Sequence, residues 1–240
     1  MASKAGFTFK RFHINHDLCA MKVGTDGILL GAWADVGSAE QVLDMGTGSG
    51  LIALQLAQRS HGACHITAVE IDSNAALQAK QNVAASPWPN KVKVVEQSIQ
   101  QFAATACQQY DLIVSNPPYF PAGQALASQA RATARHTGSL GKMDLLTAIM
   151  QLLSANGRCD LVLPFDVALE YIDAAKKIGL FLVKRVDVHT LSNKPPHRML
   201  LSLAKTAQGC DSSTLTIHHQ AGEYSSDYVA LTRDFYLKMT

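Results

Sequence analysis

The chain of 240 residues is 48% hydrophobic and 17% charged, with a formal net charge of +2. A mean hydropathy of +0.05 with so small a net charge excludes intrinsic disorder. No apolar run approaches the roughly 20 residues of a membrane-spanning helix, and the N-terminus has no secretory apolar core. Five scattered cysteines without a C-x-x-C pair indicate neither a disulfide framework nor a zinc site. We therefore expect a soluble, cytoplasmic protein without a metal.

From residue 41 onward, short apolar runs alternate with amphipathic stretches. Strands are expected at 42–45, 65–70, 92–96, 112–115 and 159–163, and helices near 51–58, 74–84, 99–106, 142–153 and 167–177. The strands read as continuous apolar runs, which is typical of strands covered on both faces. This order predicts an α/β fold with a doubly wound, mostly parallel sheet.

After residue 177 the pattern changes. Apolar runs at 180–188 and 199–203 flank a turn-rich segment, residues 192–196, which predicts an antiparallel hairpin at the sheet edge. No repeat or linker divides the chain, so we expect a single domain over residues 1–240. Residues 1–40 would form an N-terminal arm, and residues 41–240 the core.

A glycine-rich loop joins the first core strand to its helix. Gly46, Gly48 and Gly50 allow a sharp turn and close approach of a ligand at the carboxyl end of a parallel strand, where open α/β sheets bind ligands. The spacing G-x-G-x-G differs from the dinucleotide fingerprint G-x-G-x-x-G. Asp44 precedes the loop, and its carboxylate would repel a diphosphate. The loop therefore suits a cationic ligand, such as one with an ammonium and a sulfonium.

A second carboxylate, Glu70, ends the next strand about 20 residues after the loop, where an acidic side chain binds ribose hydroxyls. Asp72 follows, and we expect it to cap the next helix. Together with the glycine loop, Glu70 predicts a nucleoside-containing ligand.

A stiff polar turn follows the fourth strand. Asn116-Pro117-Pro118-Tyr119 contains two prolines, which fix φ and remove backbone donors. What remains is an amide, bare carbonyls and an aromatic ring. The amide oxygen and a carbonyl can accept both hydrogens of a planar –NH2 group, on whose π system Tyr119 can stack. Alone, the motif fits a rigid turn equally well; after the glycine loop it indicates an amino-group site.

These motifs resemble the signature of S-adenosylmethionine-dependent amino-group methyltransferases of Rossmann-like fold. More narrowly, residues from about Phe7 to the C-terminus resemble the bacterial valine-tRNA adenine N6-methyltransferases, which modify the adenine just 3′ of the anticodon. That closer likeness rests on residues 22–33, on the arginine-bearing loop after Tyr119, and on Asp234-Phe235-Tyr236.

The resemblance implies the roles of the cofactor-binding residues. Gly46, Gly48 and Gly50 would line the methionine moiety. Asp44 would meet its ammonium directly or through water, and Glu70 the ribose. Residues of the arm would close over the amino-acid end of the cofactor, namely Thr25 with Lys22 nearby. Many relatives have an aspartate at the cofactor adenine where this chain has Ser98, and Gln97 is an alternative for that contact.

The resemblance also implies the reaction, attack by an adenine N6 on the sulfonium methyl group. Hydrogen bonds to Asn116 and the Pro117 carbonyl would orient the nitrogen lone pair and stabilise the developing positive charge. The arm and the C-terminal half are net basic, which favours a polyanionic partner, here tRNA. Candidate phosphate contacts are Lys10, Arg11, Arg131, Arg135, Lys194 and Arg198. No obligatory protein partner is evident.

Four alternatives stay open at this point. A protein glutamine N5-methyltransferase uses the same motif, although such enzymes usually carry an N-terminal helical domain. An rRNA guanine N2-methyltransferase would more often have Phe at position 119. A DNA adenine methyltransferase would need a recognition domain for which the chain has little room. A non-catalytic RNA-binding protein would not need the intact motif at 116–119.

Overall fold

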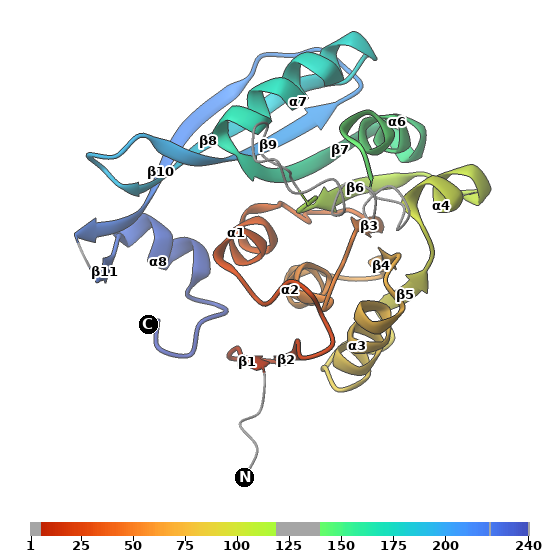
Figure 1. Ribbon diagram of the computed structural model, residues 1–240, viewed down its shortest axis with the longest axis horizontal. Coiled ribbons are helices and arrows are strands. Elements are labelled where there is room, and N and C mark those ends of the chain that lie inside the picture. Colours follow the sequence, from red (N-terminus) through yellow and green to blue (C-terminus); the bar gives the residue numbers. More distant parts are fainter. Residues whose placement is uncertain (1–5, 119–139, 221, 240) are drawn as a thin grey trace, which may run out of the picture.

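The structure is a computed structural model that describes residues 6–118, 140–220 and 222–239. Its centre is a nine-stranded sheet in the order β11-β10-β8-β9-β7-β6-β3-β4-β5, with helices on both faces (Figure 1). The α/β fold expected from the sequence is thereby confirmed. Among the described residues, no helix is both long and apolar enough to cross a membrane.

Five parallel strands form the part of the sheet that the sequence predicts. They are β3 (Gln41–Met45), β4 (His65–Glu70), β5 (Val92–Glu96), β6 (Tyr110–Ser115) and β7 (Leu153–Pro164). β7 begins six residues earlier than expected, directly after its preceding helix. After buried Leu153, residues 154–158 of β7 include three polar side chains and are mostly partly or fully exposed, so this stretch lacks the apolar signature of a central strand.

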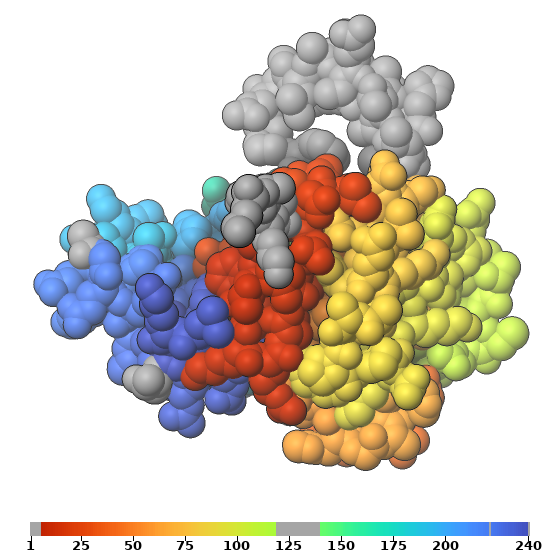
Figure 2. Space-filling model, turned by 90° about the horizontal axis from the view of Figure 1, so that it is seen from below, coloured from red at the N-terminus to blue at the C-terminus, as the bar shows by residue number. Residues whose placement is uncertain are grey.

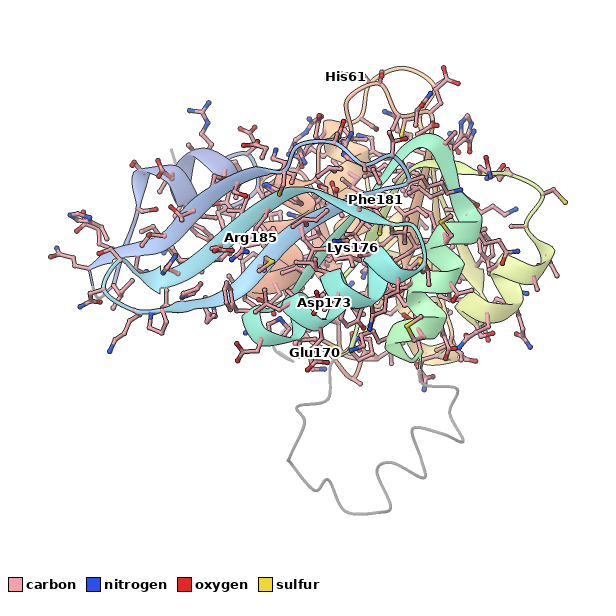
Figure 3. The ribbon with its side chains drawn as sticks, turned by 90° about the horizontal axis from the view of Figure 1, so that it is seen from above. His61, Glu170, Asp173, Lys176, Phe181 and Arg185 are labelled. Carbon is pink, nitrogen blue, oxygen red and sulfur yellow. The ribbon has the colours of Figure 1, made fainter. Side chains whose placement is uncertain are left out.

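Two groups of helices cover the sheet. One face is covered by α1 (Thr25–Trp33) and α2 (Leu51–Arg59), with α3 (Ser73–Ala84) beside β5 and α8 (Ser226–Thr232) beside α1. The other face is covered by α4 (Ile99–Thr105), α6 (Lys142–Leu152) and α7 (Phe165–Lys177). Figure 3 shows α7 lying across the sheet, with His61 at the edge where the parallel strands begin. The carboxyl ends of these strands therefore lie at the opposite edge.

The predicted hairpin is present, and the sheet continues beyond it. β8 (Phe181–Leu191) and β9 (Pro196–Ala204) are antiparallel, and β9 inserts between β8 and β7. β10 (Asp211–Gln220) then adds parallel to β8, and β11 (Glu223–Tyr224) adds antiparallel to β10. The hairpin is therefore not the outermost part of the sheet. β10 is largely exposed and polar, which explains why its sequence does not read as a strand.

The N-terminal arm packs against the C-terminal segment and against α3. β1 (Gly6–Thr8) and β2 (His13–Asn15) form a small antiparallel hairpin. Phe9 bridges to Tyr236 near the C-terminus, and the Lys10 N–H donates to the carbonyl of Phe235. Figure 2 shows the arm, in red, between the C-terminal segment in blue and the yellow segment that contains α3. This packing brings residues 13–25 toward the loops at the carboxyl edge of the sheet.

Candidate active site

The carboxyl ends of the adjacent strands β4, β3 and β6 lie side by side at one edge of the sheet. β3 pairs with β4 on one side and with β6 on the other, with Asp44 opposite both Ala68 and Val114. The Ser115 hydroxyl donates to the carbonyl of Met45 at 2.8 Å and joins the ends of β3 and β6. This is the topological switch point at which open α/β sheets bind ligands. The glycine loop and the 116–119 motif therefore start side by side.

The glycine loop has a backbone that strongly favours glycine. Gly46, Gly48 and Gly50 have φ values of 73°, 55° and 84°. A Cβ atom placed on Gly46 or Gly48 would meet no atom of the described residues within 4 Å. The space above these two residues is open, as a binding loop requires. A Cβ atom placed on Gly50 would instead lie 3.5 Å from the Cβ of Ala79, so this glycine lets α2 begin close to α3.

Asp44 lies under this loop and braces it. The carboxylate is fully buried, and its Oδ2 accepts hydrogen bonds from the Thr47 hydroxyl at 2.6 Å and the Ala53 N–H at 3.2 Å. Within the described residues, Oδ1 is buried without a hydrogen-bond partner. A buried acceptor of this kind is costly unless a donor completes it, so the site suits a bound cation or an ordered water. Thr47 is not among the predicted site residues, although the Asp-x-x-Thr spacing within one loop could have indicated this hydrogen bond.

We expect Asp44 to make stability depend on pH. Burial raises the pKa of Asp44 from 3.8 to about 7, despite the opposing hydrogen bonds from Thr47 and Ala53. The folded protein keeps this proton while the unfolded chain loses it, so the free energy of unfolding should fall between about pH 4 and pH 7. Denaturant titrations at several pH values should show that the free energy of unfolding falls less steeply with rising pH in Asp44→Asn than in wild type. The same dependence of unfolding free energy on pH in both proteins would contradict this prediction. Buried Asp160, with a pKa raised to about 6, contributes equally to both proteins.

Glu70 holds the second half of the site. Its Oε2 accepts the Gly48 N–H at 2.8 Å, and its Oε1 accepts the N–H groups of Ile71 and Asp72 at 2.9 and 3.0 Å. Both carboxylate oxygens are thus fixed by backbone donors, and Oε2, which accepts only one of these hydrogen bonds, retains acceptor capacity for a ligand hydroxyl. The side chain therefore ties the glycine loop to the end of β4.

Two neighbouring residues act as helix caps. The Asp72 carboxylate accepts the Ala75 N–H at 2.8 Å at the start of α3, which confirms the expected cap. Ser98 caps α4 by accepting the Gln101 N–H at 3.2 Å. The O–H of Ser98 remains a donor that can meet a ligand at the end of β5.

The arm residues expected at the cofactor are Lys22 and Thr25. The Lys22 ammonium donates to the carbonyls of His16 and Cys19 at 2.8 and 3.3 Å, so it braces the arm internally. Thr25 is exposed at the first position of α1. Cys19 is buried, and its thiol pKa is raised to about 11 by burial and by the nearby charge of Glu70. The arm therefore runs close to the Glu70 side chain.

The amino-group motif is described up to its third residue. Asn116 is half-buried, Pro117 is buried and Pro118 is exposed, directly after the end of β6. Tyr119 lies outside the described residues. Asn116 therefore directly follows β6, the strand that pairs with β3 at the glycine loop.

The candidate phosphate contacts are spread over the molecule. The Lys10 ammonium donates to the carbonyl of Met239 at 2.6 Å, and Arg198 donates to Asp26 at 2.8 Å. Arg11 is exposed and lies over the Trp88 ring at 5.3 Å, and Lys194 is exposed in the β8–β9 turn. Arg131 and Arg135 lie outside the described residues. The structure thus gives intramolecular roles to Lys10 and Arg198, and leaves Arg11 and Lys194 presented to solvent.

The residues at this edge fit S-adenosylmethionine. Two carboxylates suit a ligand with an ammonium, a sulfonium and ribose hydroxyls, and the buried Oδ1 atom of Asp44 calls for a donor. Gly46 and Gly48 leave room above the loop. Glu70 and Ser98 stand at the ends of consecutive strands, where an adenosine would extend away from the methyl group.

Comparison with known proteins gives the same class. The family described as methyltransferase small domain matches residues 23–143. A tRNA1(Val) (adenine(37)-N6)-methyltransferase of Aeromonas hydrophila is 54% identical over 239 residues and covers 100% of both chains. A protein of the same name from Klebsiella pneumoniae is 46% identical, covering 98% of this chain and 96% of its own.

Solved structures support the fold. A protein described as a predicted O-methyltransferase from Agrobacterium tumefaciens superposes with a TM-score of 0.66 at 18% identity, over 88% of this chain and 96% of its own. A ribosomal protein L11 methylase from Lactobacillus delbrueckii has a TM-score of 0.54 at 17% identity, over 75% and 77%. At such identities the likeness establishes the fold and leaves the substrate to the sequence relatives.

Proposed function

Because the chain belongs to the family of tRNA1(Val) (adenine(37)-N6)-methyltransferases, we propose that it transfers the S-adenosylmethionine methyl group to N6 of adenine 37 in a valine tRNA. The observation that carries this proposal is the identity of 46–54% over nearly the whole chain to relatives of that name. The same full-length match favours adenine in tRNA over glutamine or guanine as the methyl acceptor. Asn116 beside the glycine loop supports a planar amino group as the acceptor.

In this reaction, residues 116–119 of the chain bind and orient the adenine. S-adenosylmethionine, when bound, supplies an electrophilic methyl group on a positively charged sulfur. The side-chain oxygen of Asn116 and the carbonyl of Pro117 accept the two amino hydrogens of the adenine and orient the nitrogen lone pair. These bonds strengthen as positive charge develops on nitrogen, so they stabilise the transition state more than the bound substrate. Tyr119 stacks on the base, which must leave the anticodon-loop stack.

Labelled-methyl transfer to separate acceptors tests this function. Total tRNA, ribosomal subunits, DNA and release factors should be incubated individually with the pure protein and labelled S-adenosylmethionine. We expect transfer only to tRNA, and mass spectrometry of digested valine tRNA should place N6-methyladenosine at position 37. Transfer only to a release factor or to ribosomal RNA would overturn the substrate and leave the methyl-transfer chemistry standing.

Phosphate contact by the loop after Tyr119 is a separate prediction. Reversing Arg131 and Arg135 to Glu should raise the apparent KM for tRNA and leave cofactor affinity unchanged. Since each lost phosphate contact lowers the salt slope of binding by about one, the double variant should have a slope smaller by about two. Filter binding at several salt concentrations measures it.

A matched double variant controls for net charge. Lys176→Glu with Lys177→Glu makes the same charge change at the exposed end of α7, where Figure 3 labels Lys176. The control should keep the wild-type slope. An unchanged salt slope of tRNA binding in the Arg131/Arg135 variant would contradict phosphate contact by this loop. Arg11 and the N-terminal arm would then be the better candidates for phosphate contact.

A further inference from the structure

Asn82 is a buried amide that stands between the arm and the glycine loop. It lies in the last turn of α3 with 1% of its surface exposed. Its side chain makes three hydrogen bonds, all to backbone atoms. Oδ1 accepts the Asn15 N–H at 3.0 Å, and Nδ2 donates to the carbonyls of Asn15 and Ser49, both at 2.8 Å. One side chain therefore joins β2 of the arm to the loop between Gly48 and Gly50.

The arm beyond Asn15 is held to α3 and to itself by hydrogen bonds. The Leu18 N–H donates to Gln78 Oε1 at 3.0 Å, one helical turn before Asn82 on the same helix. The Val23 N–H donates to Nδ1 of His16 at 3.1 Å, and Lys22 closes the same turn onto His16 and Cys19. Residues 16–23 thus form a braced loop, and Cys19 carries it close to Glu70.

Besides the hydrogen bond from Thr47 to Asp44, backbone groups anchor the glycine loop. Its N–H groups are held by the Val69 carbonyl, Glu70 and Thr47, and the carbonyl of Ser49 by Asn82. A loop with three glycines at positive φ has many alternative conformations when it is released, so each anchor limits that freedom. Asn82 is the anchor that also fixes the arm.

We propose that Asn82 is a positioning residue for the cofactor, because it fixes the arm and the glycine loop relative to each other on two sides of one site. The proposal rests on the proposed function for the identity of the ligand. Asn82 itself touches neither substrate nor reacting atoms. Its loss should therefore weaken cofactor binding, while kcat at saturating cofactor stays within about twofold because Asn116 is undisturbed.

Hydrogen exchange of the ligand-free protein tests the proposal without activity. Asn82→Ala should speed exchange in residues 13–23 and also in the loop 46–50, by roughly tenfold, as expected for losing hydrogen bonds of ordinary strength. Gln78→Ala is the matched variant, because it removes an arm contact and leaves Ser49 held. It should speed exchange in the arm alone. Ser202→Ala, which loses a buried hydrogen bond to Asp160, should leave both segments unchanged.

Calorimetry with S-adenosylmethionine and S-adenosylhomocysteine completes the test. We expect Asn82→Ala to weaken both ligands roughly tenfold or more, Gln78→Ala less, and Ser202→Ala not at all. Asn82→Asp is a second variant of the same shape that turns a donor into an acceptor facing two carbonyls, and it should bind as weakly. Unchanged affinity in Asn82→Ala, or failure of both Asn82 variants to fold, would overturn the proposal. Wild-type protein that binds neither ligand would overturn the proposed function instead.

Discussion

Asn116→Ala should lower kcat by about a hundred- to a thousandfold and change the KM values for tRNA and S-adenosylmethionine only slightly. The loss of one preorganised hydrogen-bond partner at a developing charge has an effect of this size. Asn116 is well placed for it, because the hydrogen bond from Ser115 to Met45 fixes the end of β6 against β3. Single-turnover rates with excess enzyme measure the chemical step directly.

Two variants make the result specific to the amide. Asn116→Asp retains an oxygen acceptor in the same position and should keep more activity than Asn116→Ala. Asn156→Ala removes an exposed asparagine near the start of β7 and should behave as wild type. Full kcat in Asn116→Ala on valine tRNA would rule out the proposed mechanism.

The parallel half of the molecule could be predicted because its signals are local. Strands β3 to β6 are short apolar runs, and the glycine loop, Glu70 and Asn116 each follow such a run directly. Once the strands are parallel and adjacent, their carboxyl ends must meet, so the site follows from the order of elements. The relatives confirm the cofactor class and the activity that these motifs indicate.

The missed elements lack such local signals. Helix α1 is buried at every position from Gly27 to Ala32, so its sequence has no amphipathic stripe. β10 is mostly polar and exposed, and pairs with β8 only through its backbone. Both become visible only when the surrounding structure is assembled.

The coupling of the arm to the loop could not be predicted for a further reason. Asn15 and Asn82 are 67 positions apart, and Leu18 and Gln78 are 60 apart. An amide on a helix carries no sign of which distant backbone it will meet. The ammonium of Lys22 closes the arm onto His16 and Cys19, and the buried amide of Asn82 joins the arm to the loop.

Glu70→Gln should bind S-adenosylmethionine roughly ten- to a hundredfold more weakly than wild type, although the two side chains have the same shape. Both oxygens of Glu70 accept backbone N–H groups, one from Gly48 and the other from Ile71 and Asp72. A glutamine has only one acceptor oxygen, so its NH2 must face one of these donors, which loosens the loop and removes the charge that receives the ribose hydroxyls. Asp72→Ala is the control, because it removes the α3 cap at a cost of about 1 kcal/mol in stability and should leave affinity unchanged. Calorimetry distinguishes the two, and wild-type affinity in Glu70→Gln would exclude Glu70 as the residue that holds the cofactor.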